Sequence, residues 1–170
     1  MEYVHSVKSP VGMLTVSSDG KNISGLWIEG QKYFAKTLEK DVLEENLPVF
    51  KNVREWLAVY FSGKNPGFMP PLAPKGSPFQ KSVWNILCKI PYGQTMTYGE
   101  IAKHLERENK GKHTSARAVG GAVGHNPISI LIPCHRVIGK TGDLTGYAGG
   151  IDIKIKLLES EGITPVVRTP

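Results

Sequence analysis

The residue types best suited to covalent chemistry stand together at Cys134, His135 and Arg136. They follow the apolar run 128–132 and Pro133. Because proline has no backbone N–H, we expect a buried strand that ends at Pro133 and presents the thiol. Neighbouring His and Arg side chains lower a thiol pKa from about 8.5 and so favour the thiolate that attacks carbon. A cysteine that only packs is the ordinary alternative, but the flanking residues favour a nucleophile.

Two further residues could be relevant to a thiol site: the acidic Glu161 and the second cysteine, Cys88. Glu161 lies at the C-terminal end of a helix expected over 152–160, where the helix dipole disfavours a negative charge, so its carboxylate should have a partner. Cys88 is expected to pack inside a helix. Two cysteines are too few for a disulfide framework, a structural zinc site or an iron–sulfur cluster. We therefore expect reduced thiols, no metal and no cofactor.

The charge of the chain is unevenly distributed. The net charge is +6, yet residues 1–73 carry eight basic and eight acidic side chains, whereas residues 74–170 carry thirteen and seven. A basic half beside a neutral one indicates that one half meets a polyanion, most often nucleic acid, although an ordinary solvated surface explains the charge equally well. No window resembles a membrane span or a signal peptide, so a cytoplasmic protein is expected.

The first half of the chain has a scaffold pattern. Residues 2–28 alternate short β-type runs with turns, which predicts an antiparallel meander. Residues 31–45 favour a short helix or an irregular arm. Apolar residues spaced by three or four over 48–61 predict an amphipathic helix that packs on the sheet.

Five prolines between Pro66 and Pro78 indicate an extended connector. We accordingly expect a scaffold domain over 1–73 and a second domain over 74–170. The second domain begins with a helix: Ser77 is its N-cap, and Gln80 completes a capping box. The expected buried face of this helix comprises Phe79, Val83, Ile86, Leu87 and Ile90.

Two short helices then form a helix-turn-helix pattern. Residues 97–100 give another capping box for a helix through Leu105, a polar loop follows over 106–113, and 114–124 read as a helix of small residues. Gly120 and Gly121 cost this helix stability, which close approach of another surface would explain. A projecting Arg117 favours a DNA groove as that surface, and packing against the protein's own core is the alternative. Lysines such as Lys103 and Lys112 are candidates for phosphate contacts.

The glycine-rich segment 139–150 follows the thiol. It lacks both the P-loop ending and the GxGxxG fingerprint, which argues against nucleotide binding. A loop folded over Cys134 is the better interpretation.

The motifs PCHRV at 133–137, ARAVGGA at 116–122 and Asn126-Pro127 closely resemble those of the methylated-DNA–protein-cysteine methyltransferases, the O6-alkylguanine repair proteins. The resemblance is strong from about Phe79 to Gly162 and weaker before it. It implies an α/β (α+β) protein with an N-terminal ribonuclease-H-like α/β domain and a C-terminal winged helix-turn-helix domain that carries the active site. It also implies single-turnover repair by irreversible transfer of an alkyl group to the protein.

The resemblance assigns a role to each matching position. Cys134 corresponds to the alkyl acceptor, His135 to a base acting through a water, Glu161 to the residue that orients it, and Asn126 to a hinge. Arg117 corresponds to the residue that replaces the flipped nucleotide, and Tyr98 to one that rotates its phosphate and contacts the base. Other implied DNA contacts are Thr97, Ser115, Ala118, Gly121, Ala122 and Arg136, and the implied guanine pocket comprises Val137, Tyr147, Ala148, Gly149 and Gly150. Ser129 and Ala148 stand where some members have proline and serine.

Three functions are compatible with these residues. The first is the DNA repair alkyltransferase, acting on double-stranded DNA that contains alkylated guanine, as a monomer. The second is a non-catalytic module that binds alkylated bases, which the acceptor cysteine argues against. The third is a thiol hydrolase using Cys134, His135 and Glu161, which would leave the basic half unexplained. The size of the alkyl group, activity on alkylated thymine and cooperativity on DNA stay open.

Overall fold

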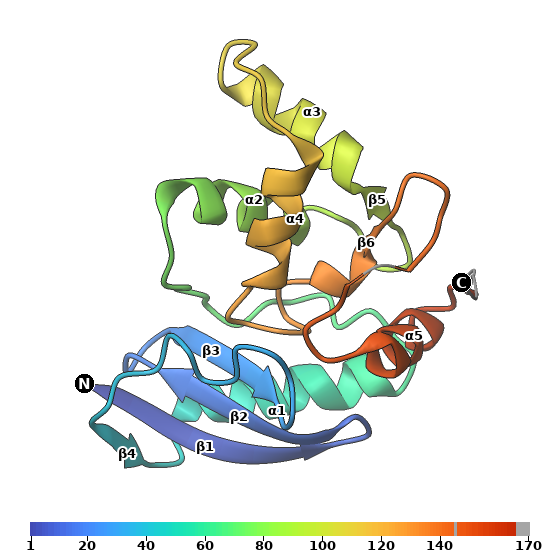
Figure 1. Ribbon diagram of the computed structural model, residues 1–170. Helices are drawn as coiled ribbons and strands as arrows, with labels where there is room; N and C mark the ends of the chain where they lie inside the picture. The colour runs from blue at the N-terminus through green and yellow to red at the C-terminus, as the bar shows by residue number, and fades with distance from the viewer. Residues whose placement is uncertain (145, 166–170) are drawn as a thin grey trace. The chain divides into compact units, whose positions relative to one another are not determined.

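The computed structural model describes residues 1–144 and 146–165, which fall into two compact units (Figure 1). The first unit comprises residues 1–75 and 127–131, and the second comprises residues 76–126 and the chain from 132 onward. The chain thus returns to the first unit for five residues, 127–131, and leaves it two residues before it reaches Cys134. Among the described residues, no helix is long and apolar enough to cross a membrane.

The first unit is a mixed four-stranded sheet with one long helix. Its strands are β1 (Glu2–Ser9), β2 (Gly12–Ser18), β3 (Ile23–Ile28) and β4 (Val42–Glu44), in the order β3-β2-β1-β4. The predicted meander is confirmed, because β1, β2 and β3 pair antiparallel in sequence order. The 31–45 segment is an irregular arm of turns and not a helix, and it ends in β4, which pairs parallel with β1.

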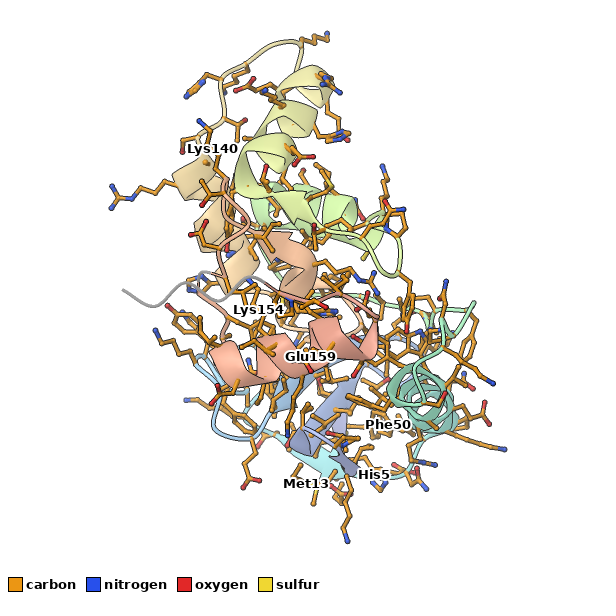
Figure 2. All side chains as sticks on the ribbon, turned by 90° about the vertical axis from the view of Figure 1, so that its right-hand side faces the viewer. His5, Met13, Phe50, Lys140, Lys154 and Glu159 are labelled. Carbon is orange, nitrogen blue, oxygen red and sulfur yellow. The ribbon has the colours of Figure 1, made fainter. Side chains whose placement is uncertain are left out.

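Helix α1 (Pro48–Phe61) confirms the predicted amphipathic helix. Its buried side chains are Val49, Phe50, Val53, Trp56, Leu57 and Tyr60. Phe50 stacks on His5 of β1, with ring centroids 5.9 Å apart (Figure 2). The fully buried Leu14, Val16 and Leu26 complete this apolar core on the sheet.

The second unit contains the remaining elements. These are α2 (Pro78–Cys88), β5 (Met96–Thr97), α3 (Tyr98–Glu108), α4 (Ala116–Gly124), a 3₁₀ turn η1 (Cys134–Arg136), β6 (Val137–Ile138) and α5 (Ile151–Ser160). Both predicted capping boxes form, at Ser77 with Gln80 and at Thr97 with Glu100, and Ser115 caps α4. Strands β5 and β6 pair parallel, so the start of α3 is tied to the segment that follows Cys134.

Several predicted details of this unit are wrong. Helix α3 continues to Glu108, three residues into the predicted loop. Phe79 and Cys88 are exposed and do not pack in the core as expected. Helical spacing places a residue on a face, but the neighbours that cover that face come from distant parts of the chain.

The predicted strand before Pro133 is also wrong, although its burial is right. Pro127 accepts a hydrogen bond from Leu26 N–H, and Ser129 N–H donates one to the Leu26 carbonyl, both at 2.9 Å. Only Ile128 forms a β-bridge, with Leu26 of β3. The chain then turns at Ile130, whose φ of 70° is left-handed, and Leu131 N–H donates to the Ser129 carbonyl at 2.8 Å. The left-handed region is unfavourable for a β-branched residue, so the apolar run is held in a strained turn.

Candidate active site

Cys134 begins a tight turn that its preceding proline shapes. Pro133 has φ −80° and ψ 63°, and Cys134 N–H donates a 2.8 Å hydrogen bond to the Ile132 carbonyl. A hydrogen bond between residues two apart, around a central residue with these angles, defines an inverse γ-turn. Cys134 is thereby placed as the first residue of η1, with 7% of its surface exposed. The sequence correctly indicated that Pro133 redirects the chain, although no strand precedes it.

Glu161 is the centre of a buried cluster of charges. Its Oε2 accepts a 2.6 Å hydrogen bond from His135 Nε2, and its Oε1 accepts a 2.8 Å hydrogen bond from Arg136 Nε. The backbone N–H of Gly93 donates to the same Oε1 at 2.9 Å. The side chains of His135 and Glu161 have no exposed surface. The Glu161 carboxylate was expected to have a partner, and it accepts hydrogen bonds from three groups: His135, Arg136 and Gly93.

Arg136 requires a correction, because the resemblance implied a DNA contact for it. The residue is buried, and its Nη1 also donates a 2.8 Å hydrogen bond to the Ile90 carbonyl. Its guanidinium lies 5.9 Å from the centre of the Tyr92 ring. Arg136 thus fixes Glu161 from inside the protein, and its charge is not available to a phosphate.

The protonation states in this cluster follow from its contacts. Burial raises the pKa of Glu161, but the His135 hydrogen bond, the charge that His135 carries at acidic pH, the Gly93 hydrogen bond and the charge of Arg136 outweigh it and bring the pKa to about 2. An ionised carboxylate only accepts hydrogen bonds, so His135 carries its proton on Nε2. Burial lowers the pKa of His135 despite the Glu161 contact, which favours a neutral ring. Nδ1 then carries the lone pair and is the ring nitrogen able to accept a proton.

The thiol of Cys134 is held in its protonated form. Burial raises the pKa of Cys134 and outweighs hydrogen bonding from Asn126, the charge of Lys154 and hydrogen bonding from Tyr147, all of which lower it. The expectation of a lowered thiol pKa, drawn from its sequence neighbours, is therefore wrong for this state. Because the resting group is a thiol, a nucleophilic attack by Cys134 would need a base to remove its proton.

Asn126 and Lys154 fix opposite ends of the Cys134 segment. Asn126 Nδ2 donates a 2.9 Å hydrogen bond to the Ile132 carbonyl, just before the turn. Lys154 Nζ donates a 2.6 Å hydrogen bond to the Val137 carbonyl, just after it. Burial lowers the pKa of Lys154 to about 8, although the charges of Cys134 and Asp143 oppose the shift. A cation at this place stabilises a thiolate.

Lys154 is a site residue that was not predicted from the sequence. The residue is 1% exposed, whereas Glu159 on the same helix is exposed (Figure 2). A signal was present: Lys154 precedes the buried Leu157 and Leu158 by three and four residues, so it lies on the apolar face of α5. A lysine on an apolar helix face is buried only where its charge has partners.

The predicted pocket residues all lie within the described region. Tyr147 is buried with 8% of its surface exposed, and Ala148 and Gly149 are half-buried beside it. Val137 is fully buried, and its carbonyl is engaged by Lys154. Residue 145 of the glycine-rich segment lies outside the described residues. Ser129, at the position where some family members have proline, uses its N–H to bond Leu26 and its hydroxyl to bond Gln31 Oε1 at 3.2 Å.

Helix α4 differs from this site in being open to solvent. Ser115, Arg117, Ala118 and Gly121 are exposed. A Cβ added at Gly121 would meet nothing within 4 Å, whereas one at Gly120 would lie 3.8 Å from the Tyr98 ring. The contact at Gly120 would be an ordinary van der Waals contact, so packing within the protein requires neither glycine. Ala122 is buried, and its carbonyl accepts a 2.9 Å hydrogen bond from Trp84 Nε1, so it holds α4 onto α2 and does not face a partner.

Tyr98 and Thr97 link the two regions of this unit. Thr97 pairs with Ile138 across β5 and β6 and caps α3, and Tyr98 is the first residue of that helix. The half-buried Tyr98 ring lies against α4 at Gly120. Among the described residues, no group of three or more His, Cys, Asp or Glu side chains is arranged to hold a metal ion.

Two family models together match most of the chain. Residues 3–74 match the ribonuclease-like domain of 6-O-methylguanine DNA methyltransferase, and residues 78–163 match its DNA-binding domain. The methylated-DNA–protein-cysteine methyltransferase of Methanosarcina mazei is 46% identical over 159 residues, which is 94% of this chain and 96% of that protein. The protein of the same name from Haemophilus influenzae is 44% identical, over 91% of this chain and 83% of that protein.

The fold is similar to known crystal structures. Mycobacterium tuberculosis OGT in complex with DNA superposes with a TM-score of 0.81 at 39% identity, over 96% of this chain and 95% of that one. Mycobacterium tuberculosis O6-methylguanine methyltransferase gives a TM-score of 0.78 at 41% identity, over 95% and 93% of the two chains. The predicted combination of a ribonuclease-like domain and a DNA-binding domain is therefore confirmed.

Proposed function

The chain belongs to the 6-O-methylguanine DNA methyltransferase family, and we propose that it repairs DNA by moving the alkyl group of O6-alkylguanine onto Cys134. It is a methylated-DNA–protein-cysteine methyltransferase that turns over once. The observation that carries the choice of residue is the buried thiol of Cys134 next to a neutral His135, whose Nε2 is fixed by the ionised Glu161 at 2.6 Å. A nucleophile, a base and a group that orients the base are thus joined in one turn.

The transfer step follows from these protonation states. His135 Nδ1 takes the thiol proton, through a water, and the sulfur attacks the alkyl carbon in line with the guanine oxygen. The sulfur–carbon bond forms as the carbon–oxygen bond breaks, and the electron pair of that bond leaves with the base. Tyr98 assists protonation of the departing guanine. The thioether product has no facile route back, so each molecule repairs one lesion.

The DNA partner is proposed from helix α4. A target base inside a duplex must be extruded, which costs a few kcal/mol. Arg117 projects from the exposed face of α4, where it can occupy the gap that the base leaves. The open surface at Gly121 permits close approach of a groove. We propose alkylated double-stranded DNA as the substrate, a monomer as the active form and the cytoplasm as the location.

The competing functions account for fewer of these features. A binding module without chemistry needs neither the thiol nor the buried His135–Glu161 pair. A thiol hydrolase leaves the exposed, glycine-containing α4 without a role. Both alternatives predict that Cys134 keeps its mass after an encounter with methylated DNA.

The test is mass spectrometry of the intact protein after incubation with duplex DNA containing one O6-methylguanine. We expect a stable gain of one methyl group per protein molecule, mapped by peptide analysis to Cys134. The Cys88→Ser variant is the matched control, because Cys88 is the other cysteine of the chain and should be dispensable. No gain of mass, or a methyl group found on Cys88, would contradict the proposal.

A further inference from the structure

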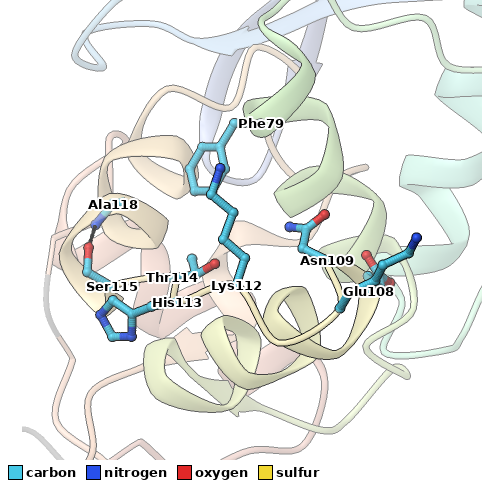
Figure 3. Close-up of a pocket in the computed structure, with 9 residues that line it drawn as sticks. Phe79, Glu108, Asn109, Lys112, His113, Thr114, Ser115 and Ala118 are labelled. Carbon is cyan, nitrogen blue, oxygen red and sulfur yellow. Dashed lines mark hydrogen bonds between the residues drawn. The ribbon is translucent and has the colours of Figure 1, made fainter.

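The second unit contains a hollow that the transfer reaction does not use. It has a volume of ≈ 690 Å³ and lies among the start of α2, the end of α3 and the turn into α4 (Figure 3). Figure 3 shows Glu108 and Asn109 on its α3 side and His113 and Ser115 on its α4 side. The residues around it are Phe79, Glu108, Asn109, Lys110, Lys112, His113, Thr114, Ser115 and Ala118.

The turn that forms one wall of the hollow has a defined backbone. Gly111 N–H donates a 2.7 Å hydrogen bond to the Glu106 carbonyl, which closes the end of α3 with the six-residue return of a Schellman motif. The Glu106 carboxylate then reaches the far side of the turn, where it accepts a 3.1 Å hydrogen bond from Thr114 N–H and lies 3.4 Å from His113 Nδ1. The lysines of this turn therefore project from fixed positions.

Lys110 occupies a backbone position that does not suit it. Its φ of 56° is left-handed, a conformation that glycine adopts without cost and other residues adopt at a cost in folding free energy. The side chain is exposed, so burial does not offset that cost. The property of lysine that glycine lacks here is a positive charge at the rim of the hollow.

The charges around the hollow suit an anion. Two lysines, Lys110 and Lys112, and one acidic residue, Glu108, line the hollow, while the Glu106 carboxylate beside it is engaged by Thr114 N–H and His113. The first turn of α4 contains no acidic residue. Ser115 caps α4 at the rim, where the helix dipole adds partial positive charge. The hydroxyls of Thr114 and Ser115 and the amide of Asn109 supply hydrogen-bonding groups.

We infer that this hollow receives a phosphate and sugar of the DNA backbone, beside the groove that α4 occupies, and so extends the contact beyond the lesion. The inference rests on the proposed function, because Ser115 and Ala118 belong both to the hollow and to the DNA-facing side of α4. A duplex lying along α4 passes the rim of the hollow, which favours DNA over an acidic peptide. Phosphate contacts of this kind fix the register of a protein on a duplex without reading its sequence.

The test compares single charge removals that the backbone tolerates. Lys110→Gly removes a charge and relieves the left-handed strain, so its Tm should equal or exceed that of the wild type. Lys112→Ala removes the neighbouring charge, and Lys156→Ala, on the exposed face of α5, is the control. Affinity for an unmodified duplex is measured by fluorescence anisotropy over a range of salt concentrations. The same variants are also measured on two shorter duplexes, one lacking base pairs on one side of the centre and the other lacking them on the opposite side.

We expect Lys110→Gly and Lys112→Ala each to weaken duplex binding about three- to tenfold and to reduce the salt slope by about one counterion, with Lys156→Ala unchanged. The loss should disappear on one of the two shortened duplexes, which lacks the contacted phosphate. Wild-type affinity in both turn variants, an equal loss in Lys156→Ala, or a loss that persists on both shortened duplexes would each overturn the inference. Methyl transfer to Cys134 at saturating DNA is recorded separately, so failure of the proposed function is distinguishable.

Discussion

The Cys134 site and helix α4 belong to the same unit and are built in opposite ways. At the site, each polar group is fixed by another: Glu161 holds His135 and Arg136, and Lys154 holds the Val137 carbonyl. On α4, Arg117 is exposed and Gly121 has open space around it. The residue types at the site are thus explained from within the molecule. Those on the open face of α4 are not, so they report an external partner.

This difference separates two kinds of mutational effect. Substitutions at the site should change chemistry and stability together, because each group there is buried and bonded to its neighbours. Substitutions on the open face of α4 should change DNA binding while stability stays the same or improves. Five expected results test that separation, from the largest effect to the smallest.

Cys134→Ser should abolish alkyl transfer. A serine hydroxyl is a far poorer nucleophile than a thiolate, but it preserves the shape and charge of the residue. Binding to an unmodified duplex should remain within about threefold of wild type, because α4 is untouched. Transfer is measured by methyl incorporation and binding by anisotropy. Stoichiometric methylation of this variant would remove Cys134 from the reaction.

Glu161→Gln should lower both the stability and the rate of transfer. The variant leaves the buried Arg136 without a counter-charge, and breaking a buried ion pair costs about 3–5 kcal/mol. Loss of the carboxylate that fixes the His135 proton should slow transfer by about 10²-fold or more and change its pH profile. Urea unfolding and single-turnover kinetics measure the two effects. Glu159→Gln is the matched control, since Glu159 is exposed on the same helix.

The pH dependence of this stability has a definite sign. The pKa of Glu161 is depressed in the folded protein, from 4.5 to about 2, so its contribution is fully present above 4.5 and is lost as the pH falls toward 2. The shift corresponds to roughly 3 kcal/mol. The stability difference between wild type and Glu161→Gln should therefore be constant near neutral pH and shrink in that acidic window. A difference that grows on acidification would disprove the charge assignment.

Arg117→Ala should slow repair in a duplex by about tenfold or more, since ~1.4 kcal/mol of the extrusion cost corresponds to a factor of ten. Reaction with a free O6-alkylguanine base should be nearly unchanged, because that substrate needs no extrusion. A mismatch opposite the lesion should restore part of the duplex rate. Arg107→Ala, exposed on α3, is the control. Equal slowing on free base and duplex would place Arg117 in the chemistry.

Gly121→Ala should cause the smallest changes, and they should have opposite directions: stability should rise and duplex affinity should fall. Replacing an interior helical glycine by alanine stabilises a helix by about 0.5–1 kcal/mol, and the added methyl meets nothing within 4 Å. Duplex affinity should nevertheless fall a few-fold, because the methyl group would stand where we propose that the groove approaches. Thermal unfolding and anisotropy give the two results. A variant that is more stable and binds duplex as well as wild type would show that α4 does not approach DNA closely at this position.

The parts of the fold that depend on local sequence were predictable. The capping boxes at Ser77 and Thr97 involve residues three apart, and the meander over 2–28 follows from alternating runs and turns. Burial of the segment before Pro133 was also predictable, but its conformation was not. An apolar run reports that a segment is buried, whereas the turn at Ile130 depends on hydrogen bonds to Leu26, a hundred residues earlier.

At the site, too, features that depend on neighbouring residues were predictable, whereas features that depend on residues far along the chain were not. The turn of Cys134 and His135 was found because its residues are adjacent, and the helix dipole indicated that Glu161 needs a partner. The location of Arg136 was predicted wrongly, because its partners at residues 90 and 161 are far away along the sequence. The raised thiol pKa was missed for a related reason: burial is a property of the packed structure, and it outweighs the charges beside Cys134.

Because residues 127–131 belong to the first unit, no single break in the polypeptide chain separates the two units. Ile128, Ile130 and Leu131, each at most 1% exposed, belong with β3, although the chain on both sides of them belongs to the second unit. A fragment expressed from Gly76 onward would carry this apolar segment without Leu26 and the rest of its strand. Exchange of the first unit between homologues must accordingly include these five residues as part of the transplanted module, so that the segment leading to Cys134 keeps its matching strand.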